Sequence, residues 1–73
     1  MDPITILWAD DEIDLFKPQL LFLKKKGYEV VTVTNGHDAL AEYDRNGADL
    51  VLLDLMLPGI PGTEVCRQLR LRG

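Results

Sequence analysis

The sequence predicts an α/β fold in which three strands and three helices alternate and the strands form one parallel sheet. Short runs of β-branched and aliphatic residues alternate with segments whose apolar residues recur at helical spacing. Gly, Pro and Asn-Gly signals separate these segments. Strands joined through helices need right-handed crossovers, and both faces of a parallel sheet need cover. We therefore expect a three-layer βαβαβα domain.

The first strand is followed by a long helix. Residues 4–9 (ITILWA) are a β-branched and aromatic run typical of a buried strand, and Trp8 is expected to fill core. Apolar residues then recur at helical spacing up to Lys24–Lys26, and Gly27 is a stop signal. Pro18 lies inside this pattern without the N–H that bonds one turn back. It therefore either kinks the helix or delays its regular part.

The second strand and helix follow directly. Residues 28–34 (YEVVTVT) have high β-propensity. Asn35-Gly36 breaks the strand, and a short amphipathic helix then runs to about Asn46-Gly47. His37 lies at the start of this helix, where we expect it to be exposed to solvent.

The third strand is predicted at residues 49–55 (DLVLLDL), which is apolar on both faces at residues 51–53. A loop rich in Pro and Gly occupies residues 56–62. Thr63 is expected to cap the third helix, because a hydroxyl can accept a hydrogen bond from the first helical turn. Cys66 on the apolar face of that helix is expected to be a small buried hydrophobe.

Composition narrows the classes of function. The chain has 73 residues, which fits one small domain. Its net charge of −4 disfavours direct binding to a nucleic-acid backbone. No apolar run approaches the roughly 20 residues that span a bilayer, so no membrane association is expected. The single cysteine cannot form an intrachain disulfide, which suits the reducing cytoplasm.

Three carboxylates follow strands of the predicted sheet. Asp10 and Asp11 come directly after the first strand, and Asp54 lies at the end of the third. Ligands of open parallel sheets bind outside these strand ends. Like charges that meet there repel unless a hard cation such as Mg²⁺ neutralises them, and one carboxylate can then attack phosphorus. Taken singly, each acid has a structural alternative as a helix cap or turn residue.

Two segments resemble the response-regulator receiver family. They are ITILWADDE at residues 4–12 and VLLDLMLPGIPG at residues 51–62. In that family an acidic pair follows the first strand, and a phosphoacceptor Asp ends the third within a D-x-x-[ML]-P-x-x-x-G pattern. The positions that match this pattern are Asp54, Leu57, Pro58 and Gly62. The resemblance covers essentially the whole chain and implies a flavodoxin-like sheet with strand order 2-1-3.

The resemblance also implies a role for each residue of the acidic cluster. Asp54 corresponds to the phosphoacceptor and Asp11 to a direct Mg²⁺ ligand. Asp10 corresponds to an acid that acts on the metal through water, and the backbone carbonyl of Met56 to the third protein ligand. The implied phosphodonor is a histidine kinase. The implied activity is that of a phosphoacceptor and not of an enzyme.

Receiver domains have five βα units, and residues 1–73 supply three, so we expect a partial receiver domain truncated before the fourth unit. The Ser/Thr and Lys that the family uses to hold phosphoryl oxygens have no counterpart here, and self-phosphotransfer is expected to be impaired. The strand at 49–55 then lies at the sheet edge without the inward-pointing charge or the Pro that protects edges. This predicts self-association, as a homodimer, through that strand.

Two functions of different classes stay open. The chain is a phosphorelay receiver that accepts a phosphoryl group on Asp54 with Mg²⁺. Alternatively, it is a non-catalytic truncated, chimeric or engineered half-domain whose acids are idle. A metal-dependent phosphatase or nucleotide-binding protein is disfavoured, because no D-x-D follows a strand and neither G-x-G-x-x-G nor a P-loop occurs.

Overall fold

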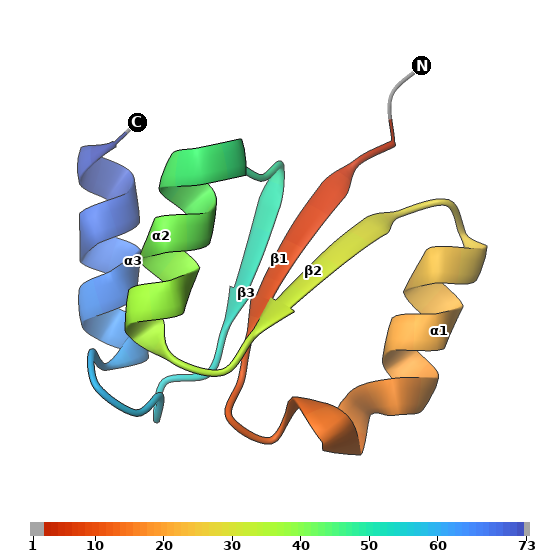
Figure 1. Cartoon of the computed structure of the whole chain (residues 1–73), viewed down its shortest axis with the longest axis horizontal. Helices are drawn as coiled ribbons and strands as arrows, with labels where there is room; N and C mark the ends of the chain where they lie inside the picture. Colours follow the sequence, from red (N-terminus) through yellow and green to blue (C-terminus); the bar gives the residue numbers. More distant parts are fainter. Residues whose placement is uncertain (1–2, 73) are drawn as a thin grey trace.

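The computed structural model describes residues 3–72 and contains one parallel sheet with strand order β2-β1-β3 (Figure 1). The strands are β1 (Thr5–Ala9), β2 (Glu29–Val33) and β3 (Leu50–Leu53). The helices are a 3-10 turn η1 (Ile13–Phe16), α1 (Lys17–Lys25), α2 (Gly36–Asn46) and α3 (Gly62–Leu71). The predicted alternation and the strand order 2-1-3 are both confirmed. The strand at 49–55 is shorter than predicted, because regular pairing ends at Leu53.

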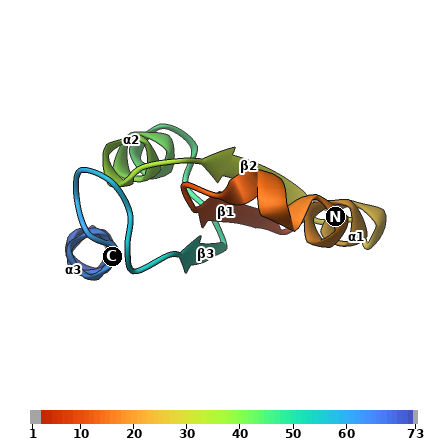
Figure 2. The same ribbon diagram turned by 90° about the horizontal axis from the view of Figure 1, so that it is seen from below.

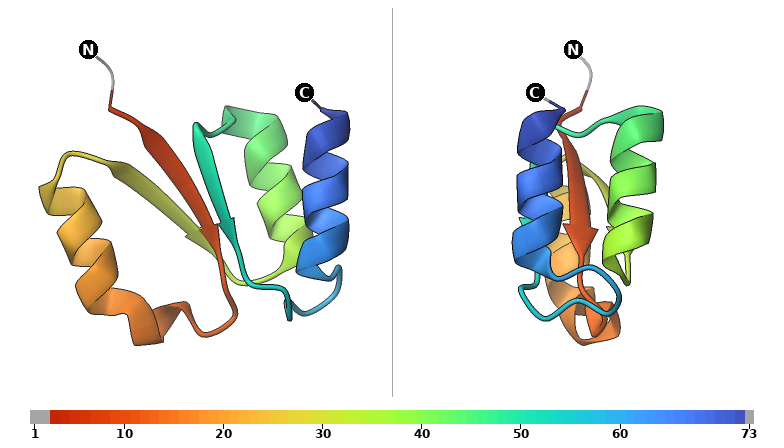
Figure 3. Two further views of the ribbon diagram at one scale, coloured as in Figure 1. Left: turned by 180° about the vertical axis from the view of Figure 1, so that it is seen from behind. Right: turned by 90° about the vertical axis from the view of Figure 1, so that its left-hand side faces the viewer.

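The elements form three layers. α1 covers one face of the sheet, whereas α2 and α3 lie together on the other face (Figure 2). The views in Figure 3 show the same arrangement from behind and from the side. The molecule is thin, with extents of 31 × 29 × 15 Å. None of the helices in residues 3–72 has the length and apolar character that a bilayer crossing requires.

The central strand β1 is the most buried element. Its residues Ile6, Leu7 and Ala9 are between 0% and 3% exposed, because β2 and β3 pair with it on both sides. The prediction that Trp8 fills core was wrong. Its side chain is half-buried, and its ring centroid lies 5.2 Å from that of Phe16. A single helix on this face does not cover the indole completely.

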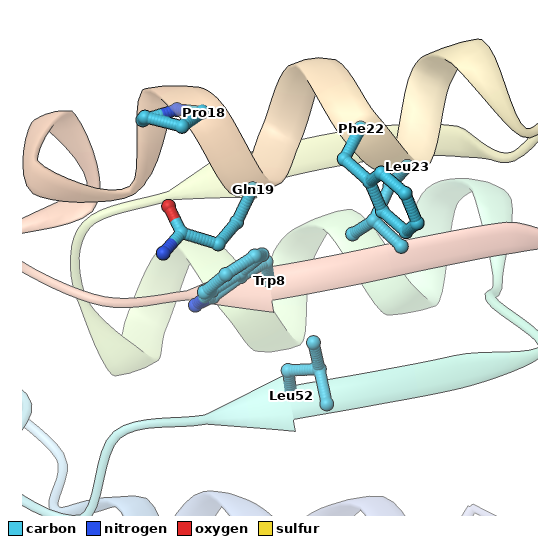
Figure 4. Close-up of a pocket in the computed structure, with 6 residues that line it drawn as sticks. All are labelled: Trp8, Pro18, Gln19, Phe22, Leu23 and Leu52. Atoms are coloured by element: carbon cyan, nitrogen blue, oxygen red, sulfur yellow. The ribbon is translucent and has the colours of Figure 1, made fainter.

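The face under α1 therefore keeps an open apolar groove with a volume of about 440 Å³. Figure 4 shows Trp8 and Leu52 rising from the strands towards Phe22 and Leu23 of the helix. The side chain of Phe22 is still 59% exposed. No residue of α1 is buried, so this face contributes little to the closed core.

The main core cluster lies on the other face, between β1, α2 and α3. Its members are Ala9, Ala39, Leu57 and Val65, each no more than 6% exposed. Burying a leucine side chain stabilises a fold by about 1.5–3 kcal/mol, so Leu57 ties the loop after β3 to this core. Cys66 was expected to be buried but is half-buried, since it lies beside Val65 and not on the innermost line of α3.

The helix starts explain two further outcomes. η1 precedes α1, and Pro18 falls in the first turn of α1, where its missing N–H costs no hydrogen bond. Pro18 was predicted either to kink the helix or to delay its regular part, and the structure shows the delay. α3 begins at Gly62 with Pro61 at its N-cap, so the prediction that Thr63 caps the helix was wrong. The helix starts two residues earlier than predicted, where Gly62 closely approaches the preceding loop.

Candidate metal centre

Three carboxylates meet at the carboxyl ends of neighbouring strands. Asp10 and Asp11 follow β1 and Asp54 follows β3, and one carboxylate oxygen of each lies within 4.8 Å of the others. Both chain segments leave the sheet at its lower edge in Figure 1. Asp10 and Asp54 are half-buried, and Asp11 is exposed. The convergence predicted for these three residues is therefore present in the structure.

Backbone pairing fixes two of these acids to the sheet. The N–H of Asp54 donates to the carbonyl of Ala9 at 3.0 Å. The N–H of Asp10 donates to the carbonyl of Val33 on the opposite side of β1, also at 3.0 Å. Each hydrogen bond extends the sheet ladder by one residue past the strand end. The backbone of Asp10 and Asp54 is consequently held by the sheet, and this fixes the position from which their carboxylates extend.

Each of these carboxylates is oriented by a local hydrogen bond. Oδ1 of Asp10 accepts from the backbone N–H of Glu12 at 2.9 Å. Oδ1 of Asp54 accepts from the backbone N–H of Met56 at 3.1 Å. The ion pairs of residues 3–72 involve other carboxylates, those of Glu42, Glu64 and Asp44. Within the described residues, the charge of the cluster is therefore not balanced by a basic side chain.

The loop after Asp54 turns back on itself at a glycine. The N–H of Gly62 donates to the carbonyl of Leu55 at 3.2 Å. A Cβ atom at Gly62 would overlap the carbonyl oxygen of Asp54, so this position admits no side chain. Met56, which lies in this loop between Asp54 and Gly62, is 82% exposed. The sequence pattern contained Leu57 and Gly62 but gave no physical reason for them. In the structure, Leu57 anchors the loop in the core, and Gly62 allows the close contact with the backbone of Asp54.

The donor set fits a hard divalent cation. Oxygen ligands are those that Mg²⁺ prefers, and it usually binds one or two carboxylates directly and keeps several waters, through which a further carboxylate can act. Three carboxylates packed within 4.8 Å repel each other unless a cation or proton intervenes. The side chains that could hold the ion are those of Asp10, Asp11 and Asp54.

Comparison with known proteins identifies the family of this chain. Residues 6–73 match the response regulator receiver domain. The chain belongs to the response-regulator receiver family. Its parallel sheet is accordingly the flavodoxin-like sheet of receiver domains, and the acidic edge is the one at which receivers bind Mg²⁺.

One similar curated relative of this receiver chain is the sensory transduction protein RegX3 of Mycobacterium tuberculosis. The two are 56% identical over 68 residues, which is 93% of this chain and 30% of RegX3. The receiver chain thus spans about 30% of the length of this relative.

Solved receivers have the same arrangement. The signal receiver domain of a putative LuxO repressor protein from Vibrio parahaemolyticus aligns with a TM-score of 0.88 at 26% identity, over 96% of this chain and 54% of that one. The response regulator protein TrrA from Thermotoga maritima, in complex with Mg(2+)-BeF, aligns with a TM-score of 0.85 at 38% identity. That alignment covers 94% of this chain and 60% of TrrA. TrrA has also been solved in complex with the histidine kinase ThkA.

Proposed function

We propose that this receiver accepts a phosphoryl group on Asp54 from the phosphohistidine of a histidine kinase, with Mg²⁺ at the acidic edge. The observation that carries the proposal is the meeting of three carboxylates within 4.8 Å at the end of two neighbouring strands. The receiver TrrA, which is similar to this chain, was solved both with Mg(2+)-BeF and in complex with a histidine kinase. Both complexes support the same assignment.

In the proposed transfer, one carboxylate oxygen of Asp54 attacks phosphorus. The new O–P bond forms as the P–N bond to the donor imidazole breaks, and the electron pair leaves with the imidazole nitrogen. The N–H of Met56, which donates to Oδ1 of Asp54 at 3.1 Å, holds the carboxylate in one orientation. Because transfer needs the attacking and leaving atoms in line, this orientation reduces the rearrangement that the reaction requires.

The remaining acids are proposed to hold the cation. Asp11, Asp54 and the carbonyl of Met56 are the direct ligands, and Asp10 acts through water. When bound, Mg²⁺ offsets the negative charge of the carboxylates and of the transferred phosphoryl oxygens. The chain acts as an acceptor that is modified once, and not as an enzyme that turns over.

The test uses beryllofluoride, a stable substitute for the phosphoryl group, together with Mg²⁺. The fluorescence of Trp8, two residues before Asp10, reports binding. We expect the parent chain to respond saturably and Asp54→Asn to lose the beryllofluoride response. Asp14→Asn is the matched control, because Asp14 is an exposed carboxylate on η1 outside the cluster. Identical titrations of the parent and Asp54→Asn would contradict the proposed acceptor.

A second function, self-association through β3, is favoured by a separate observation. β3 pairs only with β1 among the described strands and lies at the sheet edge. Leu50 on this strand is 49% exposed, and β3 carries neither a charged residue nor a proline. Unprotected edge strands pair readily with a second chain. We propose a homodimer in which two copies of β3 meet.

A further inference from the structure

The loop that follows Asp54 rests on the first turn of α2 at a residue without a side chain. The N–H of Gly36 points at the carbonyl of Pro58, 3.5 Å away. A Cβ atom at Gly36 would lie 2.6 Å from the carbonyl oxygen of Ile60. It would also lie 2.9 Å from the Cβ of Ile60 and 2.9 Å from a methyl of Val65. The loop therefore occupies the space that any side chain at Gly36 would need.

Two neighbouring contacts hold the same part of the loop against α2. Leu57 is 6% exposed and belongs to the core cluster that includes Ala39 of α2. Gly59 has φ +78°, and a Cβ atom there would lie 3.1 Å from Cδ2 of His37. The backbone from Leu57 to Ile60 thus follows the surface of the first helical turn, one residue after Met56.

The turn that supports the loop is itself fixed by a reciprocal pair of hydrogen bonds. Oδ1 of Asn35 accepts from the backbone N–H of Asp38 at 2.8 Å, and Nδ2 of Asn35 donates to Oδ2 of Asp38 at 2.9 Å. Asn35 is the N-cap of α2. Such caps hold the start of a helix in one conformation. Gly36 directly after the cap consequently has a well-defined position against which the loop can pack.

We propose that Gly36 is a positioning residue for the Asp54 site. It touches neither the cation nor the phosphoryl group. It lets the segment from Pro58 to Ile60 lie on α2, and this sets the path of the adjacent Met56, whose N–H orients the carboxylate of Asp54. The inference rests on the proposed function and names a residue, remote from the acids, that determines how well they bind Mg²⁺.

The variant Gly36→Ala tests this role. The added methyl meets the backbone oxygen of Ile60, which cannot rotate away as a flexible side chain could, so the loop must move. Substitutions that disturb the support of a metal site typically weaken binding by about 10–100-fold. We expect Gly36→Ala to weaken Mg²⁺ binding by about tenfold, measured through Trp8 fluorescence, while its far-UV circular dichroism stays that of the parent. Mg²⁺ binding within about twofold of the parent would overturn the proposal.

A matched control separates positioning from helix stability. Ala41 is exposed on the same helix, and Ala41→Gly weakens α2 without adding an atom near the loop. We expect its Mg²⁺ affinity to stay within about twofold of the parent. Equal losses in Ala41→Gly and Gly36→Ala would mean that Mg²⁺ binding follows helix stability, and the positioning role would be wrong.

Two further measurements cover the remaining outcomes. If Gly36→Ala does not fold, Ile60→Ala removes a half-buried side chain from the contact without adding atoms, and unchanged Mg²⁺ affinity there would overturn the proposal. If the parent itself does not bind Mg²⁺, the proposed function fails. The position of the loop is then read without metal from the amide NMR shifts of Met56 and Gly62. Shifts that move in Gly36→Ala but not in Ala41→Gly support the positioning role, and shifts unchanged in both contradict it.

Discussion

Asp54 combines a structural and a chemical contribution in one residue. Its backbone N–H extends the sheet by pairing with Ala9, and its Oδ1 accepts from the N–H of Met56. An amide at this position can still accept that hydrogen bond, whereas alanine cannot. Asp54→Asn therefore removes the nucleophile and one negative charge while keeping the turn, which is why it is the appropriate variant for testing phosphoryl acceptance.

The two acids after β1 should contribute unequally to Mg²⁺ affinity. Asp11 is the proposed direct ligand, and Asp10 is proposed to act through water. We expect Asp11→Asn to weaken Mg²⁺ binding by more than about tenfold and Asp10→Asn by less, where tenfold corresponds to about 1.4 kcal/mol. Mg²⁺ titrations of Trp8 fluorescence on both variants measure the difference. A larger loss in Asp10→Asn would reverse the assignment of the two ligands.

The helix α3 carries a local network that makes its stability depend on pH. Arg67 donates from Nε and Nη2 to the carboxylate of Glu64, and Gln68 donates to Oε2. These hydrogen bonds, led by those from Arg67, lower the pKa of Glu64 from 4.5 to about 2. A depressed carboxyl pKa stabilises the fold above the unfolded value and loses that contribution as pH falls through the folded value.

The predicted pH window therefore lies between 4.5 and about 2. We expect Glu64→Gln to unfold at a lower temperature than the parent at about pH 7, and this difference to shrink as the pH falls through the window. The Glu64 side chain is 39% exposed, so added salt should reduce the difference as well. Thermal unfolding followed by circular dichroism measures both effects. A difference that grows as the solution becomes more acidic would contradict the network's role.

Sequence periodicity predicted the elements because each depends on local pattern. The order of strands and the meeting of the three acids followed from a family resemblance, together with the rule that parallel strands end at one edge. The start of α3 was not predictable, because Gly62 is selected by its contact with the backbone of Asp54, eight positions earlier in the chain. The packing of the loop against Gly36 was equally unpredictable, since Asn35-Gly36 in the sequence indicates only the end of a strand. The exposure of Trp8 depends on how many helices cover its face of the sheet, and that of Cys66 on its position beside Val65 on α3.

At the scale of the molecule, the two faces of the sheet differ. One face holds the compact cluster between β1, α2 and α3. Within residues 3–72, the other face has one helix and an open groove of about 440 Å³, beside which the outer edge of β3 pairs with no described strand. Apolar surface and free backbone groups thus lie next to each other on the same side of the molecule. Their proximity is the physical basis for the proposed homodimer.

Self-association can be tested by placing a charge on this edge. Natural edge strands use lysine to prevent pairing, so we expect Leu50→Lys to raise the dissociation constant of the dimer by at least about tenfold. Sedimentation equilibrium gives the molecular mass for the parent and the variant. Leu21→Lys on α1 is the control, since Leu21 is 59% exposed and is not among the residues that line the groove beside β3. A monomeric parent at all concentrations would exclude the dimer.

The absence of any buried residue in α1 has a consequence for motion in the native state. Segments with few buried apolar contacts open locally with a much smaller free energy than the core. In hydrogen-exchange experiments, the amides of α1 should therefore exchange long before those of β1 and α2. Added Mg²⁺ should slow exchange around the acidic edge and leave that of α1 nearly unchanged. The sheet, with its acidic edge, and the helices α2 and α3 would then behave as one cooperative unit, to which α1 is only loosely attached.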